Sequence, residues 1–191
     1  MKHYSRLADA LTPLAKGLGS EYCNQNAYDC IQIHGGSGFM KDYACERIYR
    51  DARITSIYEG TTQLQVVAAI RHVTTGTYAG LIDTYAAAGY PAELAPVAET
   101  LKGLTELYKD AVAKVTEPNN PQYLDFMARR LVEMAGYIIM AYLLLQDAKL
   151  NESFRSTALV YTKMIQAEVA RHCEYINNFD IAQLADYTFE A

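Results

Sequence analysis

The sequence of 191 residues predicts an all-α protein built from antiparallel helical bundles. The strongest indication is an apolar pattern with alternating spacings of three and four, which recurs over residues 94–115, 124–145 and 154–179. Short polar breaks separate these segments, so consecutive helices are expected to pack side by side in opposite directions. Hydrophobic residues at 51% and charged residues at 20% provide enough apolar mass for such a core.

The first helix is expected over residues 4–33, where apolar residues again follow the helical spacing. Gly17 and Gly19 weaken this helix, because glycine lowers helix propensity. Pro13 either kinks it or marks a late start.

The segment Gly35-Gly36-Ser37-Gly38 follows, and we expect it to form a loop. Three glycines in four residues allow positive φ and expose backbone N–H groups, which suits contact with an anion. The pattern alone favours the simpler interpretation, a glycine that stops the helix and a turn after it.

A short charged helix is expected over residues 43–54. Glu46 with Arg50, and Arg47 with Asp51, are spaced for ion pairs along one helix face. Exposed pairs of this kind contribute only about 0.3–0.5 kcal/mol each, so a structural role ranks above a functional one.

Residues 54–65 place the carboxylate of Glu59 between apolar residues and Gly60, directly before a helix expected to run to residue 73. Thr61 or Thr62 is expected to cap this helix, and Thr62 with Gln65 has the spacing of a capping box. Glu59 is therefore a candidate general base at the start of a helix. The helix dipole alone also favours a glutamate here, by a few tenths of a kcal/mol to about 1 kcal/mol.

Residues 74–77, with Gly76 among three threonines, end that helix and mark a domain boundary. The predicted domains are residues 1–76 and 77–191. A short helix is expected over residues 79–88.

The breaks in the second half carry capping signals. Asn120 is expected to cap a helix whose first residue is Pro121, and Asn151 or Ser153 to cap the last helix. His172 lies on an apolar stripe, which favours a hydrogen-bonded core histidine over a ligand. Four methionines are expected to fill the core: Met127, Met134, Met140 and Met164.

The composition excludes several functions. A net charge of −5 without a basic cluster argues against nucleic acid as a partner. The four cysteines form no Cys-x-x-Cys pair and the four histidines no His-x-x-x-His, so no metal site is expected. Cys23 and Cys30 are expected to be buried free thiols. No signal peptide, long apolar span or basic amphipathic face is apparent, which indicates a cytoplasmic setting without membrane contact.

Three motifs occur in order in the first half: Gln-Ile-His-Gly-Gly-Ser-Gly-Phe at residues 32–39, Glu-Arg-Ile-Tyr-Arg-Asp-Ala at 46–52 and Ile-Tyr-Glu-Gly-Thr at 57–61. Together they resemble the C-terminal helical region of the acyl-CoA dehydrogenases, FAD flavoproteins that desaturate acyl-CoA thioesters. The resemblance is nearly ungapped from about residue 15 to residue 73. It departs at Ala44, where the family usually has proline, and at Leu64, where isoleucine is common. The second half resembles, in architecture and place, the extra helical domain appended to some bacterial members.

The resemblance implies that Glu59 is the catalytic base, which removes the α-proton of the acyl-CoA while a hydride passes to flavin N5. It implies that Gly60 contacts the substrate and that the helix over residues 43–54 positions the loop carrying Glu59. It further implies two sets of FAD contacts, the second of them across a dimer interface: Thr61, Thr62 and Gln63, and then Gln32, Ile33, His34, Gly35 and Gly36.

Electron-transferring flavoprotein is the implied electron acceptor, and a homodimer or homotetramer the implied assembly. Nothing before Ala15 resembles the N-terminal helical and middle β-domains that hold most of the flavin and the acyl chain, so we expect a C-terminal fragment of a longer enzyme, inactive by itself. Two alternatives stay open. The chain alone is a non-catalytic assembly or dimerisation module, or the full protein is a relative similar to the acyl-CoA oxidases.

Overall fold

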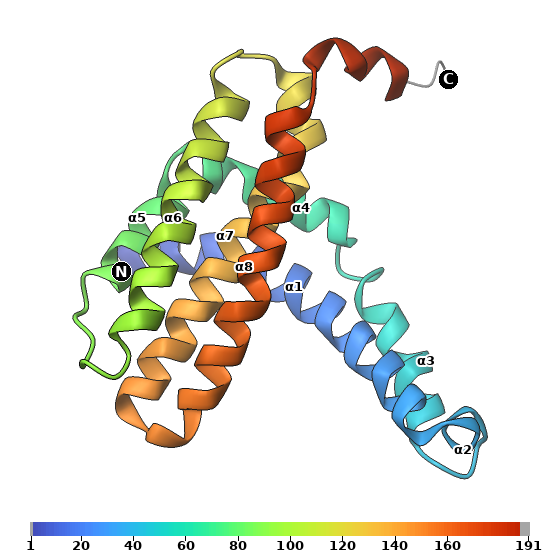
Figure 1. The fold of residues 1–191 in the computed structure, drawn as a ribbon. Helices are drawn as coiled ribbons and strands as arrows, with labels where there is room; N and C mark the ends of the chain where they lie inside the picture. Colours follow the sequence, from blue (N-terminus) through green and yellow to red (C-terminus); the bar gives the residue numbers. More distant parts are fainter. Residues whose placement is uncertain (1, 188–191) are drawn as a thin grey trace. The chain divides into compact units, whose positions relative to one another are not determined.

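The computed structural model describes residues 2–187, and side chains from Tyr4 to Tyr187. This part of the chain is helical and contains no β-strand, which confirms the all-α prediction (Figure 1). The chain divides into two compact units, Met1–Ala69 and Ile70–Ala191.

The first unit contains α1 (Lys2–His34), α2 (Gly36–Phe39), α3 (Cys45–Thr55) and the first half of α4 (Thr62–Thr74). α3 lies along the C-terminal part of α1, and α2 packs against both (Figure 1). α1 runs through the buried Pro13, so the helix has no late start.

The predicted loop at Gly35–Gly38 is wrong for part of its length, because the chain forms the single helical turn α2 there. Gly35 makes the reversal with φ +60°. A Cβ on the buried Gly38 would lie 2.7 Å from both the backbone oxygen of Ile31 and the Cβ of His34. The turn packs this closely on α1 only because residue 38 is glycine.

The first unit has a thin core whose buried side chains are mostly small. Cys23 is exposed and Cys30 is half-buried, so the prediction of two buried thiols is wrong. α1 has neighbours along a narrow stripe only, and a side chain outside that stripe meets solvent. The buried hydrophobic residues are Ala10, Leu14, Ala27, Cys45, Ala52, Val66 and Ala69.

The charged helix α3 also differs from its prediction. Among the side chains that the structure describes, no ion pair joins Glu46 to Arg50 or Arg47 to Asp51. Exposed long side chains gain little from pairing, because water screens the charges and pairing restricts their rotamers.

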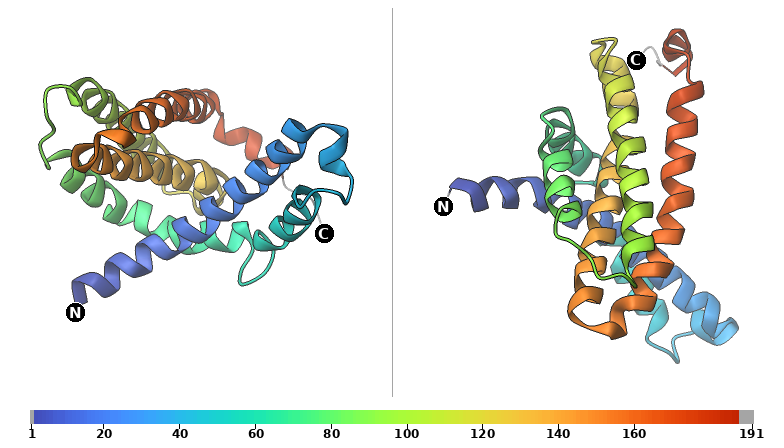
Figure 2. Two further views of the ribbon diagram at one scale, coloured as in Figure 1. Left: turned by 90° about the horizontal axis from the view of Figure 1, so that it is seen from below. Right: turned by 60° about the vertical axis from the view of Figure 1, so that its left-hand side comes forward.

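The second unit is an antiparallel bundle. α6 (Ala95–Thr116), α7 (Pro121–Leu150) and α8 (Arg155–Asn178) run side by side in alternating directions, and α5 (Thr77–Ala86) packs on α6 and α7 (Figures 1 and 2). Two 3-10 helices, η1 (Glu152–Phe154) and η2 (Ile181–Tyr187), precede and follow α8. Gly76, in the left-handed conformation, starts α5 two residues earlier than predicted.

The predicted apolar stripes form the core of this bundle, with Leu101, Leu131 and Ile165 fully buried. Met127 and Met134 are fully buried and Met140 is half-buried, but Met164 is 46% exposed, so its prediction as a core residue is wrong. Four tyrosines are the bulkiest of the fully buried side chains: Tyr78, Tyr108, Tyr123 and Tyr142.

Capping follows the prediction at one break and departs from it at the next. Asn120 Oδ1 accepts a hydrogen bond from the backbone N–H of Tyr123 at 3.1 Å, with Pro121 as the first residue of α7. Asn151 Oδ1 accepts from the N–H of Ser153 and so starts η1. α8 begins only at Arg155, after a Phe154 cap that makes no side-chain hydrogen bond.

α7 is 30 residues long, with an 18-residue window of mean hydropathy 1.3, enough in length and composition for a membrane span. We predicted that the chain has no long apolar span, and the length and composition of α7 contradict this prediction. However, 61% of that window is buried inside the structure, against α5, α6 and α8. The core helix of a bundle is typically buried in this way. The length and composition of α7 are therefore only weak support for a membrane span.

Candidate functional site

The loop between α3 and α4 carries the predicted catalytic glutamate, and its backbone is unusual. Glu59 has φ +52° and Gly60 has φ +92°. Glycine tolerates positive φ, but a residue with a Cβ pays roughly 1–2 kcal/mol in the left-handed region. Such strain persists only where the surroundings impose it, and it is concentrated at functional sites.

Two side chains hold this loop. Lys16 Nζ on α1 donates a hydrogen bond to the backbone oxygen of Gly60 at 2.6 Å. Gln65 Nε2 on α4 donates to the oxygens of Gly60 at 3.3 Å and Glu59 at 3.4 Å. A Cβ on Gly60 would lie 2.8 Å from Gln65 Nε2, so a side chain at residue 60 would disturb this contact.

The start of α4 differs from the predicted capping box. The hydroxyl of Thr61 accepts from the N–H of Leu64 at 3.3 Å, so Thr61 is the cap. Thr62 donates its hydroxyl to Glu21 Oε1 on α1 at 2.7 Å, and Gln65 turns toward the loop carbonyls. The predicted capping box does not form, because the side chains of Thr62 and Gln65 bond to residues outside the first turn of α4.

The Glu59 side chain is exposed in this chain, next to the exposed Ile57 and Tyr58. Its carboxylate is therefore open to a ligand that approaches from outside the chain. Thr61 and Gln63 are exposed and Thr62 is half-buried in the first turn of α4, on the C-terminal side of the loop.

A groove of about 880 Å³ lies on the first unit where α1, α2 and α3 meet. The predicted cofactor residue Gln32 lines it, next to the predicted Ile33, which is 83% exposed on the neighbouring face. Apolar walls come from Tyr28, Phe39, Met40 and Tyr49, and three cations, Lys41, Arg50 and Arg53, outnumber the two carboxylates of Asp42 and Glu46.

The remaining predicted cofactor residues adjoin this groove. His34 ends α1, with its ring 5.4 Å from that of Tyr43. Gly35 and Gly36 are exposed, and a Cβ on either would meet nothing within 4 Å, so a ligand can approach the backbone there. Gln32 follows Lys16 by sixteen residues on α1, so Gln32 lies about 24 Å along the helix from the lysine that holds the Glu59 loop.

Comparisons with known protein families match residues in both units of the chain. The family model described as "Acyl-CoA dehydrogenase, C-terminal domain" matches residues 2–74, and that described as "Acyl-CoA dehydrogenase C terminal" matches residues 74–184. The all-α fold and these two matches define a helical C-terminal part of an acyl-CoA dehydrogenase. The chain belongs to the acyl-CoA dehydrogenase family.

Individual proteins of this family are also similar to parts of the chain. The caffeyl-CoA reductase–Etf complex subunit CarC of Acetobacterium woodii is 52% identical over 52 residues, which cover 27% of this chain and 14% of that protein. The acyl-CoA dehydrogenase of Bacillus subtilis is 44% identical over 64 residues, covering 34% and 17%. A crystal structure of an acyl-CoA dehydrogenase family protein from Porphyromonas gingivalis has a TM-score of 0.57 at 40% identity, covering 59% of this chain and 98% of that one.

The chain spans a small part of its curated relatives, between 10% and 18% of their length. The residues of the groove fit the adenosine-diphosphate portion of FAD. Aromatic and apolar walls suit a flat base, and the surplus of cations suits a pyrophosphate. Sequence reasoning did not assign these walls or Lys16 to a site: Phe39 and Tyr49 lie in the quoted motifs without a role, and Tyr28, Met40 and Lys16 lie outside them.

Proposed function

We propose that this chain supplies the catalytic base and part of the flavin-contacting surface of an FAD-dependent enzyme that desaturates acyl-CoA thioesters. The observation that carries the proposal is the strained Glu59–Gly60 backbone, which α1 and α4 hold from both sides. Backbone strain is concentrated at functional sites, and a general base must be held in position, so this geometry favours a positioned base over a solvated cap.

The proposed reaction removes the α-proton and the β-hydride of the acyl group, giving a trans-2-enoyl-CoA. Bound FAD supplies the acceptor for the hydride. The carboxylate of Glu59 accepts the α-proton, and the backbone N–H of Glu59 donates to the thioester oxygen, where negative charge develops. Gly60 leaves room for the acyl group, because it has no Cβ. Lys16 and Gln65 keep the carboxylate in place through the loop carbonyls.

The proposed FAD contacts fall into two groups. Thr61, Thr62 and Gln63 border the loop and would face the flavin beside the substrate. Gln32, Ile33, His34, Gly35 and Gly36 border the groove and would face the adenosine-diphosphate portion. A separation of about 24 Å supports contacts to two flavins, one of them bound mainly by a partner subunit of a homodimer or homotetramer.

The electron partner is proposed from the relatives. One of them is a subunit of a caffeyl-CoA reductase–Etf complex, and others are named 3-(aryl)acrylate reductase and acryloyl-CoA reductase (NADH). Electron-transferring flavoprotein is therefore the proposed partner for the reducing equivalents. All three of these relatives have reductase in their names.

The decisive experiment is Glu59→Gln in the full-length enzyme, with flavin reduction by acyl-CoA followed in single turnover. Loss of the base is expected to slow reduction by at least about 10²-fold with flavin content unchanged. Asp29→Asn, which changes an exposed carboxylate on α1, is the matched control and should reduce flavin at the wild-type rate. An undiminished rate in Glu59→Gln would refute the assignment.

A second candidate function is that of an assembly module without chemistry, and the thin core of the first unit favours it for the isolated chain. The purified chain of 191 residues is then expected to be colourless after reconstitution with FAD. A yellow protein with one FAD per chain would contradict this. Oxygen consumption by the full-length enzyme during turnover separates a dehydrogenase from an oxidase.

A further inference from the structure

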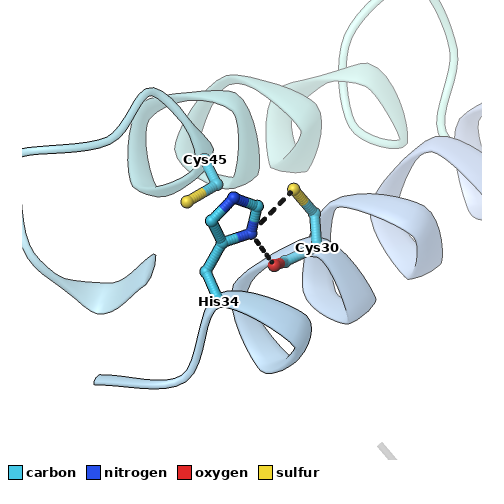
Figure 3. A group of neighbouring side chains, drawn as sticks. All are labelled: Cys30, His34 and Cys45. Atoms are coloured by element: carbon cyan, nitrogen blue, oxygen red, sulfur yellow. Dashed lines mark hydrogen bonds between the residues drawn. The ribbon is translucent and has the colours of Figure 1, made fainter. Parts of the chain in front are cut away.

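Three side chains that sequence spacing did not group meet at the end of α1. Cys30 and His34 lie four residues apart in the last turns of α1, and Cys45 is the first residue of α3. One ligand atom from each of the three lies within 4.8 Å of the other two. Figure 3 shows the imidazole of His34 between the two sulfur atoms.

The fold brings these groups together through specific contacts. Gly38 packs closely on Ile31 and His34, and its backbone oxygen accepts from Cys45 Sγ at 3.3 Å. The tilted ring of Tyr43, with its centroid 5.4 Å from that of His34, limits the ring of His34 from another direction. Cys45 is buried, Cys30 is half-buried and His34 is exposed, so the cluster is anchored inside and open outside.

The orientation of His34 suits a metal ligand. Its Nδ1 lies 2.8 Å from the backbone oxygen of Cys30 and 3.9 Å from Cys30 Sγ. A proton on Nδ1 donates to that carbonyl and leaves the lone pair of Nε2 available, the arrangement that most metal-binding histidines use. The N-terminus of α3 favours a negative ligand at Cys45, because the helix dipole is positive there.

The separations between the ligand atoms lie within about 1 Å of those in a tetrahedral zinc site. Zn–S bonds of about 2.3 Å and Zn–N bonds of about 2.0–2.1 Å put neighbouring ligand atoms roughly 3.5–3.8 Å apart. Here one ligand atom from each residue lies within 4.8 Å of the other two. His34 is exposed and Cys30 is half-buried, so rotation of these two side chains can bring their ligand atoms closer to the buried Cys45. No carboxylate belongs to the group, and two sulfur atoms with one nitrogen select a soft or borderline metal.

We propose that Cys30, His34 and Cys45 bind one Zn²⁺ ion through two thiolates and one imidazole, with the fourth position open to water or to another ligand. Binding releases the two thiol protons to solvent. The site joins the end of α1 to the start of α3 beside the groove, and it stabilises the thin first unit. It does not rest on the proposed function, because it needs neither flavin nor substrate.

The test is a Co²⁺ titration of the metal-free chain, kept reduced by a non-thiol reductant. We expect one Co²⁺ per chain, a thiolate-to-cobalt charge-transfer band in the near ultraviolet, and displacement by Zn²⁺. Cys30→Ser, His34→Gln and Cys45→Ser should each weaken binding at least about tenfold, and the two cysteine variants should also weaken the band. Zn²⁺ should raise the thermal unfolding midpoint of the wild type and of none of these variants.

Cys23→Ser is the matched control, since Cys23 is a free cysteine on the same helix outside the cluster, and it should bind like the wild type. Far-UV circular dichroism tests whether Cys45→Ser keeps its helices. If Cys45→Ser loses its helices, the variants at the two more exposed sites, Cys30→Ser and His34→Gln, decide whether the cluster binds the metal. Absence of the charge-transfer band in the wild type, or equal affinity in Cys30→Ser and His34→Gln, would overturn the proposal. So would a wild type that yields only a Cys30–Cys45 disulfide and takes up no Co²⁺ after reduction.

Discussion

Glu59 and Gly60 are two consecutive residues with positive φ in a loop fixed by a lysine more than forty positions earlier. The strain at Glu59 is tolerated because Lys16 and Gln65 satisfy the two loop carbonyls. Gly60 is the more demanding of the two residues, since both its φ of +92° and its contact with Gln65 exclude a side chain.

Gly60→Ala is therefore expected to destabilise the chain by about 1–3 kcal/mol, from backbone strain and displacement of the Gln65 amide. Gly19→Ala is the matched control, because Gly19 is inside α1 with nothing within 4 Å of its added Cβ. It should stabilise the chain by about 0.5–1 kcal/mol, since alanine favours helix. Urea unfolding of both variants measures the difference, and equal midpoints would show that the loop is not constrained.

His172 is buried as predicted, but the predicted hydrogen bond is wrong, since neither ring nitrogen has a hydrogen-bond partner in the described part of the chain and only an ion-pair distance to Glu133 is present. His172, 3% exposed on α8, places Nε2 3.2 Å from Oε2 of Glu133 on α7, and Arg129 Nε donates to Oε1 of Glu133 at 2.8 Å. Burial alone raises the pKa of Glu133, but the interactions with His172 and Arg129 outweigh it and hold that pKa below its ordinary value of 4.5.

A carboxyl group whose pKa is lower in the folded state stabilises the fold above its unfolded pKa, and this contribution is lost as the pH falls through the folded value. The free energy of unfolding should therefore fall more steeply below about pH 4.5 in the wild type than in Glu133→Gln. Denaturant unfolding between about pH 6 and about pH 3 measures both slopes. Glu168→Gln, at an exposed pair with Arg171, should follow the wild type. Parallel curves for wild type and Glu133→Gln would contradict this prediction.

At the scale of elements, the start of α7 shows local sequence and tertiary packing in agreement. Asn119 turns the chain with φ +49°, Asn120 caps and Pro121 begins the helix. The capped residue, Tyr123, is itself 1% exposed in the core, so the cap fixes the register in which α7 enters the bundle.

Asn120→Ala should cost about 1 kcal/mol of stability, because the N–H of Tyr123 loses its acceptor. Asn120→Asp is the matched control and should keep the wild-type midpoint, since its carboxylate accepts the same hydrogen bond and favours the helix N-terminus. Thermal unfolding of the two variants tests the cap. A loss in Asn120→Asp as large as that in Asn120→Ala would rule the cap out as the cause.

At the scale of the whole molecule, the two units differ in how they are stabilised. Every one of the largest fully buried side chains, from Tyr78 to Leu145, lies in the second unit. Of the 21 exposed large hydrophobic side chains in the described part, 13 lie in the first 69 residues. The first unit therefore has a small core and a large exposed apolar surface.

Amide hydrogen exchange of the isolated chain should show this difference. Amides in α1 and α3 are expected to exchange at least about tenfold faster than those in the middle of α6, α7 and α8, because opening the first unit exposes less apolar surface. The same amides of α1 and α3 should be slower in the full-length enzyme, which serves as the control. Equal protection of α1 and α7 in the isolated chain would contradict the prediction.

The sequence by itself determined the helices, most of their ends, the caps at Asn120 and Thr61, and the motifs that carry the family resemblance. These features depend on residues within a few positions of one another, where periodicity and hydrogen bonding act locally. Only the tertiary structure decided that Lys16 supports Gly60, that Cys23 is exposed, and that Cys30, His34 and Cys45 meet beside the groove. Those outcomes depend on which stripe of α1 packs against α3, and that choice is made by contacts between residues far apart in the chain.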